Sequence, residues 1–180
     1  MVGTRRRTIM VALAAGAVVA AGAVAWFQPQ KLLIDERVDE ALPVASTPAP
    51  ESVPKASPGQ PQASAAEVEP RILSTGSFRS LGHATSGRAV ALELGDGRRF
   101  LRLDDLRTSN GPDLFVYLSA AAADAPRDSF DDDALSLGRL RANQGSQNYQ
   151  IPGGVALNRY QSVVIWCRRF TYAFGAAPLA

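Results

Sequence analysis

The single cysteine, Cys167, carries the most direct redox chemistry of any side chain in this sequence. A thiolate is the reactive form of cysteine, and a nearby cation raises the thiolate fraction by lowering the thiol pKa. Arg168 follows directly and is predicted to act in this way. In a strand, Cys167 shares one face with Ile165, whereas Trp166 lies on the opposite face. If the cysteine face is the core, the thiol is buried and inert.

The single histidine, His83, lies in a glycine-flanked loop, Leu81–Gly87. A neutral imidazole there could act as base for a thiol, ligate a haem iron or satisfy a turn. Cys167 and His83 are therefore the candidate catalytic residues, supported by Arg168. One Cys and one His exclude an internal disulfide, and any metal site that needs two Cys or two His from one copy. The thiol is left with a sulfenic acid, a mixed disulfide, a disulfide-linked dimer or ligation to an external cofactor.

Of four other polar segments, the first two have two interpretations each. Asp104 and Asp105 could bind calcium together with Asp113, or be solvated turn carboxylates. The amide-rich segment Gln144–Tyr149 could present hydrogen-bonding groups to a ligand such as a glycan, or close a loop on itself. Four aspartates within 128–133 are typical of a solvated loop. The motif Asn110-Gly111-Pro112-Asp113 predicts a tight turn that starts a strand, with Asn or Asp side chains capping backbone amides.

The elements that must position these residues are short strands. Val90, Leu92 and Leu94 alternate with other residues at the period of a strand, and Gly95-Asp96-Gly97 is typical of a hairpin turn. No window shows a helical stripe of about 12 residues. About eight strands are predicted, in an antiparallel sandwich or barrel-like domain. They are Ile72–Arg79, Arg88–Leu94, Phe100–Leu103, Leu114–Ser119, Leu137–Leu140, Asn148–Ile151, Ser162–Cys167 and Phe170–Phe174.

The N-terminus predicts a single transmembrane helix over residues 9–27. This segment has no charged residue, follows Arg5-Arg6-Arg7, and ends in Trp26-Phe27. Its length crosses about 30 Å of hydrocarbon, and the arginines predict that residues 1–8 stay in the cytoplasm. The alternative is a cleaved signal peptide ending near Ala23-Val24-Ala25. In both cases the rest of the chain lies outside the cytoplasm, either attached to the cell membrane or secreted.

Residues 28–70 are predicted to form a stalk and linker. From Pro43 to Pro70 prolines alternate with Ala, Ser, Gln and Glu and no aromatic residue occurs, a composition that favours a disordered, extended spacer. Within this region, Lys31–Leu42 could form one short helix, which would be either a juxtamembrane stalk or a docking segment. The remaining residues, 71–180, are enough for one β domain with its own core.

Several strings in 71–180 resemble the DM-thirteen domain, also called the electron-transfer DM domain. They are Asn110–Ser119, Leu137–Leu140, Gln147–Pro152 with Asn148 and Tyr149, Tyr160–Phe170 with the Val-Ile-Trp-Cys block that contains Trp166, and Phe174–Leu179. The resemblance covers roughly Ile72 to Leu179. It implies a compact all-β domain outside the cytoplasm and a redox role centred on the motif cysteine, here Cys167. In animal proteins this module accompanies the haem-binding-type DOMON domain.

The principal hypothesis is therefore a membrane-anchored, extracytoplasmic redox or electron-transfer module that uses Cys167 without autonomous enzyme activity. Its partner would be an envelope protein or another redox protein, and a haem cofactor is compatible with the sequence but not required by it. The alternative is a non-catalytic binding or scaffold domain with a structural cysteine. Basic and acidic residues are balanced, 19 against 17, which argues against nucleic acid as a partner.

Overall fold

The computed structural model describes residues 35–45 and 69–179. The predicted membrane helix, residues 9–27, and most of the predicted linker lie outside these residues. In the part of the chain that is described, no helix is long and apolar enough to cross a membrane.

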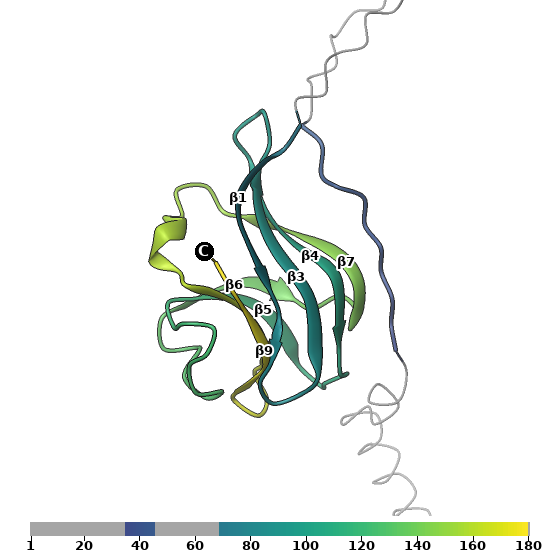
Figure 1. Cartoon of the computed structure of the whole chain (residues 1–180), viewed down its shortest axis with the longest axis vertical. Coiled ribbons are helices and arrows are strands. Elements are labelled where there is room, and N and C mark those ends of the chain that lie inside the picture. Colours follow the sequence, from purple (N-terminus) through teal and green to yellow (C-terminus); the bar gives the residue numbers. More distant parts are fainter. Residues whose placement is uncertain (1–34, 46–68, 180) are drawn as a thin grey trace, which may run out of the picture.

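The domain consists of two antiparallel sheets that face each other (Figure 1). One sheet has four strands in the order β1-β3-β4-β7, and the other has five in the order β2-β9-β8-β5-β6. The strands are β1 (Arg71–Ser77), β2 (Arg79–Ser80), β3 (Thr85–Glu93), β4 (Arg99–Thr108), β5 (Leu114–Ser119), β6 (Ala134–Arg139), β7 (Gln144–Ile151), β8 (Ser162–Cys167) and β9 (Tyr172–Pro178).

The predicted all-β antiparallel fold is confirmed, as an open sandwich rather than a closed barrel. Helical geometry within the described residues is limited to one 3-10 turn, η2 (Leu157–Arg159). Two segments were predicted incorrectly. β7 begins at Gln144, so the amide-rich segment is a strand instead of a turn. β9 begins at Tyr172, because Arg168–Thr171 forms the turn that joins it to β8.

Strand β8 is buried on both faces, which explains its continuous apolar sequence. Val163, Ile165 and Cys167 point into the core between the sheets. Val164 and Trp166 point to the outer face, where the connection between β5 and β6 covers them with Phe130. Residues 128–133, predicted to be only solvated, therefore have exposed aspartates beside a fully buried aromatic anchor.

Residues 35–45, which we call the strap, lie along the free edge of β7 (Figure 1, dark blue). Arg37 forms a parallel bridge with Gln144. The Val38 and Glu40 amides donate to the Gln144 and Ser146 carbonyls at 3.1 and 2.8 Å. The strap is thus extended where a short helix was considered for Lys31–Leu42, because its backbone groups pair with an edge strand.

Side chains make the strap specific for its position on β7. The Asn148 amide nitrogen donates to Glu40 Oε2 at 2.8 Å, and Arg141 pairs with the same carboxylate. Partial burial alone would raise the pKa of Glu40, but these contacts with Asn148 and Arg141 outweigh it and lower the pKa. Arg102 also donates to the backbone carbonyl oxygen of Glu40 at 3.0 Å. The strap therefore combines strand pairing with a carboxylate held by a cation and an amide.

Replacing Gly145 with alanine is expected to detach the strap. Gly145 has φ +97°, and a Cβ there would overlap the Val38 carbonyl oxygen. Hydrogen exchange at the Val38 and Glu40 amides should become at least tenfold faster. A clash that destabilises the attached strap by about 1.4 kcal/mol raises the equilibrium constant for its detachment from β7 by that factor. Gly97→Ala is the matched control, because Gly97 has φ +80° but open space around it. Equal acceleration in both variants would contradict the prediction.

Candidate functional site

Cys167 ends β8 with its side chain wholly buried between the sheets, at 0% exposure. Its backbone neighbours are Leu114 at the start of β5 and Tyr172 at the start of β9. No hydrogen bond among the described residues involves the sulfur. Direct attack of this thiol on an external disulfide is therefore blocked in the folded domain.

Tyr172 connects the buried thiol to the surface. It pairs with Cys167 across the β8–β9 hairpin and packs against the same core. Its ring is stacked with Phe170 at a centroid distance of 6.4 Å and with Phe174 at 5.5 Å. Phe170 is exposed, so the stack runs from the protein surface to the neighbour of the thiol. Sequence reasoning missed Tyr172, although a four-residue turn between Cys167 and Tyr172 already favours their pairing.

His83 contacts Tyr172 instead of Cys167. Its Nε2 lies 2.7 Å from the Tyr172 hydroxyl, and its ring lies 4.0 Å from the Phe174 ring centroid. The loop is held in place because the His83 amide donates to the Phe174 carbonyl at 3.1 Å. Gly82 is required here, since a Cβ would come within 2.7 Å of the Tyr172 ring. With Nε2 unprotonated, His83 is a proton acceptor for the phenol.

The surroundings of Tyr172 keep its hydroxyl protonated. Desolvation raises its pKa above the ordinary value of 10, and Cys167 adds to this effect. The guanidinium of Arg127, 5.7 Å from the ring centroid, acts in the opposite direction but does not reverse the shift. Oxidation of Tyr172 would therefore have to release a proton, and His83 is the base that the geometry provides.

Arg168 and Trp166 lie on the other side of the same sheet. The Arg168 guanidinium stacks 4.6 Å above the centroid of Phe115, whose backbone pairs with Trp166. Trp166 itself is buried and stacks with Tyr117 at 6.2 Å. The predicted support of a thiolate by Arg168 therefore lacks the required proximity, because the cation and the sulfur point to opposite faces.

The motif Asn110-Gly111-Pro112-Asp113 leads into β5 near the thiol, with a turn at Pro112 and Asp113. Arg168 donates its backbone amide to the Asp113 carbonyl at 3.0 Å, and the Asp113 carboxylate pairs with Arg139. Gly111 lies against Leu114 and Phe174, where a Cβ would come within about 2.9 Å of both side chains. The motif thus fixes the start of β5 against the turn that follows Cys167.

Asn148 of β7 contacts the strap, whereas Tyr149 belongs to the same buried core as Cys167. Asn148 Nδ2 donates to the Ala41 carbonyl at 2.7 Å. Tyr149 is buried, donates to Gln147 Oε1 at 2.8 Å, and has its pKa raised by desolvation to about 12. Gln147 in turn donates to the Ala142 carbonyl at 2.7 Å. These amides therefore bond to other groups of the protein, but within a strand and not in the loop closed on itself that the second interpretation describes.

Two of the three carboxylates considered for calcium, those of Asp104 and Asp113, are paired with arginines. Asp104 contacts both Arg88 and Arg102, and these pairs lower its pKa although burial opposes the shift. Asp113 pairs with Arg139 elsewhere. Within residues 35–45 and 69–179, no group of three His, Cys, Asp or Glu side chains could hold a metal ion.

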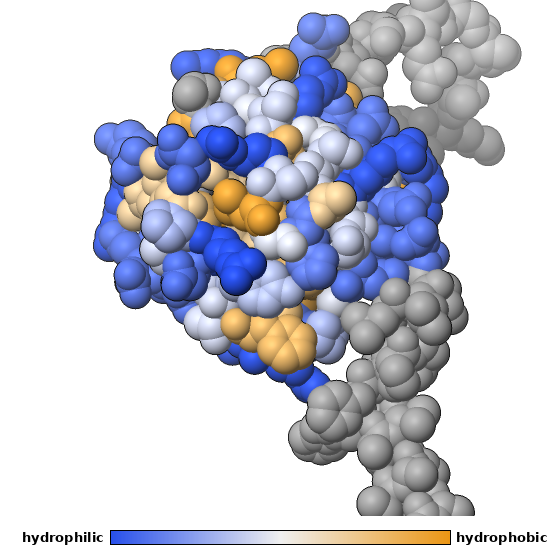
Figure 2. All heavy atoms as spheres, turned by 60° about the horizontal axis from the view of Figure 1, so that its bottom comes forward, coloured by the Kyte–Doolittle hydropathy of each residue, from blue (hydrophilic) through white to orange (hydrophobic). Residues whose placement is uncertain are grey.

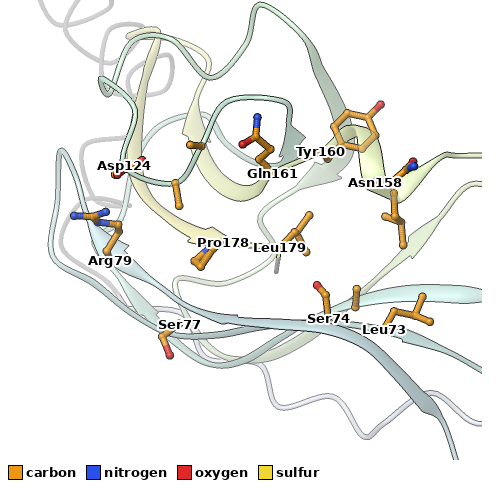
Figure 3. Close-up of a pocket in the computed structure, with 14 residues that line it drawn as sticks. Leu73, Ser74, Ser77, Arg79, Asp124, Asn158, Tyr160, Gln161, Pro178 and Leu179 are labelled. Carbon is orange, nitrogen blue, oxygen red and sulfur yellow. The ribbon is translucent and has the colours of Figure 1, made fainter.

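A cavity of about 830 Å³ lies at the opposite end of β8, beside Gln161 (Figure 3). It opens between the sheets where β1 approaches the end of β9, and Leu73, Ser74, Pro178 and Leu179 are among its walls. The Ser74 hydroxyl is buried without a hydrogen-bond partner in the described structure. This volume suits a small ligand, but about 17 Å of strand separates it from Cys167.

The structure defines a small two-sheet β module with one buried thiol, connected to the surface through a tyrosine that is hydrogen-bonded to a histidine. The sequence model of the electron transfer DM13 family matches residues 77–179, more than half of the chain, and the chain belongs to this family. No curated protein and no solved structure matches the chain.

Proposed function

We propose that the protein is a membrane-anchored, extracytoplasmic electron-transfer module in which Cys167 is the redox group and Tyr172 relays its electron to a partner. The observation that carries this proposal is the position of Tyr172, paired with Cys167 on one side and hydrogen-bonded to His83 on the other. Membership in an electron-transfer family supports the reaction class. The residues before the domain, with an uncharged segment over 9–27, support the membrane anchor.

Burial selects one-electron chemistry over thiol exchange. Exchange requires contact between two sulfur atoms, and Cys167 offers no access for a second sulfur. An electron can instead leave through Tyr172 to a one-electron acceptor on a partner, such as a transition-metal centre or a quinone. In that step the acceptor is reduced, the Tyr172 phenol becomes a tyrosyl radical, and its proton moves to His83 Nε2.

The second step restores the tyrosine. Once its proton is on His83, the tyrosyl ring moves its oxygen into contact with the Cys167 thiol and takes the hydrogen atom, which breaks the S–H bond and forms the phenolic O–H bond. His83 is half-exposed and passes its proton to solvent. The net change is oxidation of one thiol to a thiyl radical, with one electron delivered to the partner and one proton to water.

The proposal is tested by oxidising the full chain with a one-electron oxidant and recording electron paramagnetic resonance spectra. Wild type should lose titratable Cys167 thiol, counted with a maleimide after unfolding. The Cys167→Ser variant should accumulate a tyrosyl signal that decays at least tenfold more slowly, because the hydrogen donor is gone. Retention of the thiol at the level of an unoxidised sample, with no radical signal, would reject the electron-transfer role.

The second candidate is a non-catalytic binding domain in which Cys167 only packs the core. Two observations favour it: the complete burial of the sulfur and the cavity beside Ser74, whose unpartnered hydroxyl is available to a ligand. In that case Cys167→Ala should lower the free energy of unfolding. In the folded wild-type protein, the Cys167 thiol should survive treatment with the oxidant.

A further inference from the structure

The β8–β9 turn presents an apolar side chain between polar neighbours at the end of the sandwich that contains the thiol. Phe170 is 59% exposed, and the two preceding residues, Arg168 and Arg169, are also exposed. The other large exposed apolar residues of the described structure lie near the opposite end: Leu42, Val44 and Ile72. An exposed aromatic ring beside arginines is the composition that favours the interface of an anionic bilayer.

The start of the strap lies at this same end. Asn143 Nδ2 donates to Asp35 at 2.7 Å and to the Thr108 carbonyl at 3.0 Å. The Thr108 hydroxyl lies 2.9 Å from that of Thr85, which donates to the His83 carbonyl at 3.1 Å. A continuous run of contacts therefore joins Asp35 to the loop that holds His83. In Figure 1 the strap begins, and the β8–β9 turn lies, at the lower end of the domain.

Chain length limits how far this end can be from the anchor. Residues 28–34 separate Phe27 from Asp35 and span at most about 28 Å when fully extended. Because the strap is bound along β7, the longer segment 46–68 joins two parts of the domain instead of spacing the domain from residues 9–27. The opposite end lies a strand of ten residues away, or about 33 Å.

We propose that the β8–β9 turn docks on the membrane surface, with Phe170 at the lipid interface and Arg168 and Arg169 facing anionic headgroups. This inference rests on the membrane anchor of the proposed function and names the surface at which Tyr172 donates electrons to the partner. Phe170 stacks on Tyr172, so docking brings the ring next to the buried thiol within reach of a redox partner in the membrane. Figure 2 shows only small apolar patches among hydrophilic residues on the face brought forward, which fits contact through a point and not broad insertion.

The test is carried out with the full chain in vesicles that contain brominated lipids, which quench tryptophan on contact. Phe170→Trp places a probe at the turn, and Ile72→Trp is the matched control because Ile72 is 65% exposed at the other end of the sandwich. After subtraction of wild-type fluorescence, the probe at 170 should be quenched at least threefold more than the probe at 72. Equal quenching of the two probes would overturn the docking surface.

Charge and anchoring are separated by two further measurements. Replacing Arg168 and Arg169 with Gln should weaken the contact about fivefold per arginine in phosphatidylglycerol vesicles, and leave it unchanged in phosphatidylcholine vesicles. Loss of the chain from vesicles in an alkaline wash would refute the anchor but not the turn. In that case vesicles with brominated lipids are added to the washed protein, and quenching of the tryptophan at position 170 is measured. Quenching supports docking of the turn, and its absence overturns the docking surface.

Discussion

Replacing Tyr172 with phenylalanine is expected to slow oxidation of Cys167 at least a hundredfold while the fold persists. Phenylalanine keeps the stack with Phe170 and Phe174 but has no hydroxyl to give up its proton to His83. Proton transfer to a positioned base contributes about 10²- to 10⁴-fold to reaction rates. The rate of thiol loss during one-electron oxidation measures the effect.

Tyr117→Phe is the matched control for this prediction. Tyr117 belongs to the same sheet but stacks on Trp166 at the outer face, away from the thiol. Its substitution should leave the oxidation rate of Cys167 within about twofold of wild type. If both variants oxidise Cys167 at the wild-type rate, Tyr172 is not the relay.

Replacing Trp166 with alanine is expected to lower the free energy of unfolding by about 3 to 5 kcal/mol. Trp166 is 1% exposed and forms the outer cluster with Phe130 and Tyr117, so its removal leaves a cavity beneath the β5–β6 connection. Domains of this size are stable by only about 5 to 15 kcal/mol, and the variant should unfold at a much lower guanidinium concentration.

Trp166→Phe provides the comparison, because it retains an aromatic ring against Phe130 and should cost less than half as much. The midpoint and slope of guanidinium unfolding, followed by circular dichroism, measure both variants. A loss below about 1 kcal/mol for the alanine variant would show that the outer cluster does not support the sheet.

The two faces of β8 could be predicted from the sequence because alternation in a strand is a local property. Val163, Ile165 and Cys167 face the core as one set, and Val164 and Trp166 form the other. Alternation could not predict which segments of the chain cover each face of β8. Burial of Trp166 depends on Phe130, more than thirty residues away, within a segment whose aspartates indicate only solvent exposure.

The strap and the Tyr172–His83 contact required the structure. Residues 35–42 have no strong strand or helix pattern, and their conformation is set by the free edge of β7, about a hundred residues later in the chain. Likewise, His83 reaches Tyr172 only because the β2–β3 loop hydrogen-bonds to Phe174. The chemistry of the side chains points to Cys167 and to His83, but not to Tyr172, which lies between them and contacts both.

The strap also determines how the domain should be cut for experiments. A fragment limited to residues 77–179, the span shared with the family, would lack the strap and nearly all of β1. Both edges of the four-stranded sheet, β3 and β7, would then expose unpaired backbone donors and acceptors. Such edges are templates for pairing between molecules, so the shorter fragment should self-associate and aggregate, whereas a chain that begins before Asp35 carries its own protection.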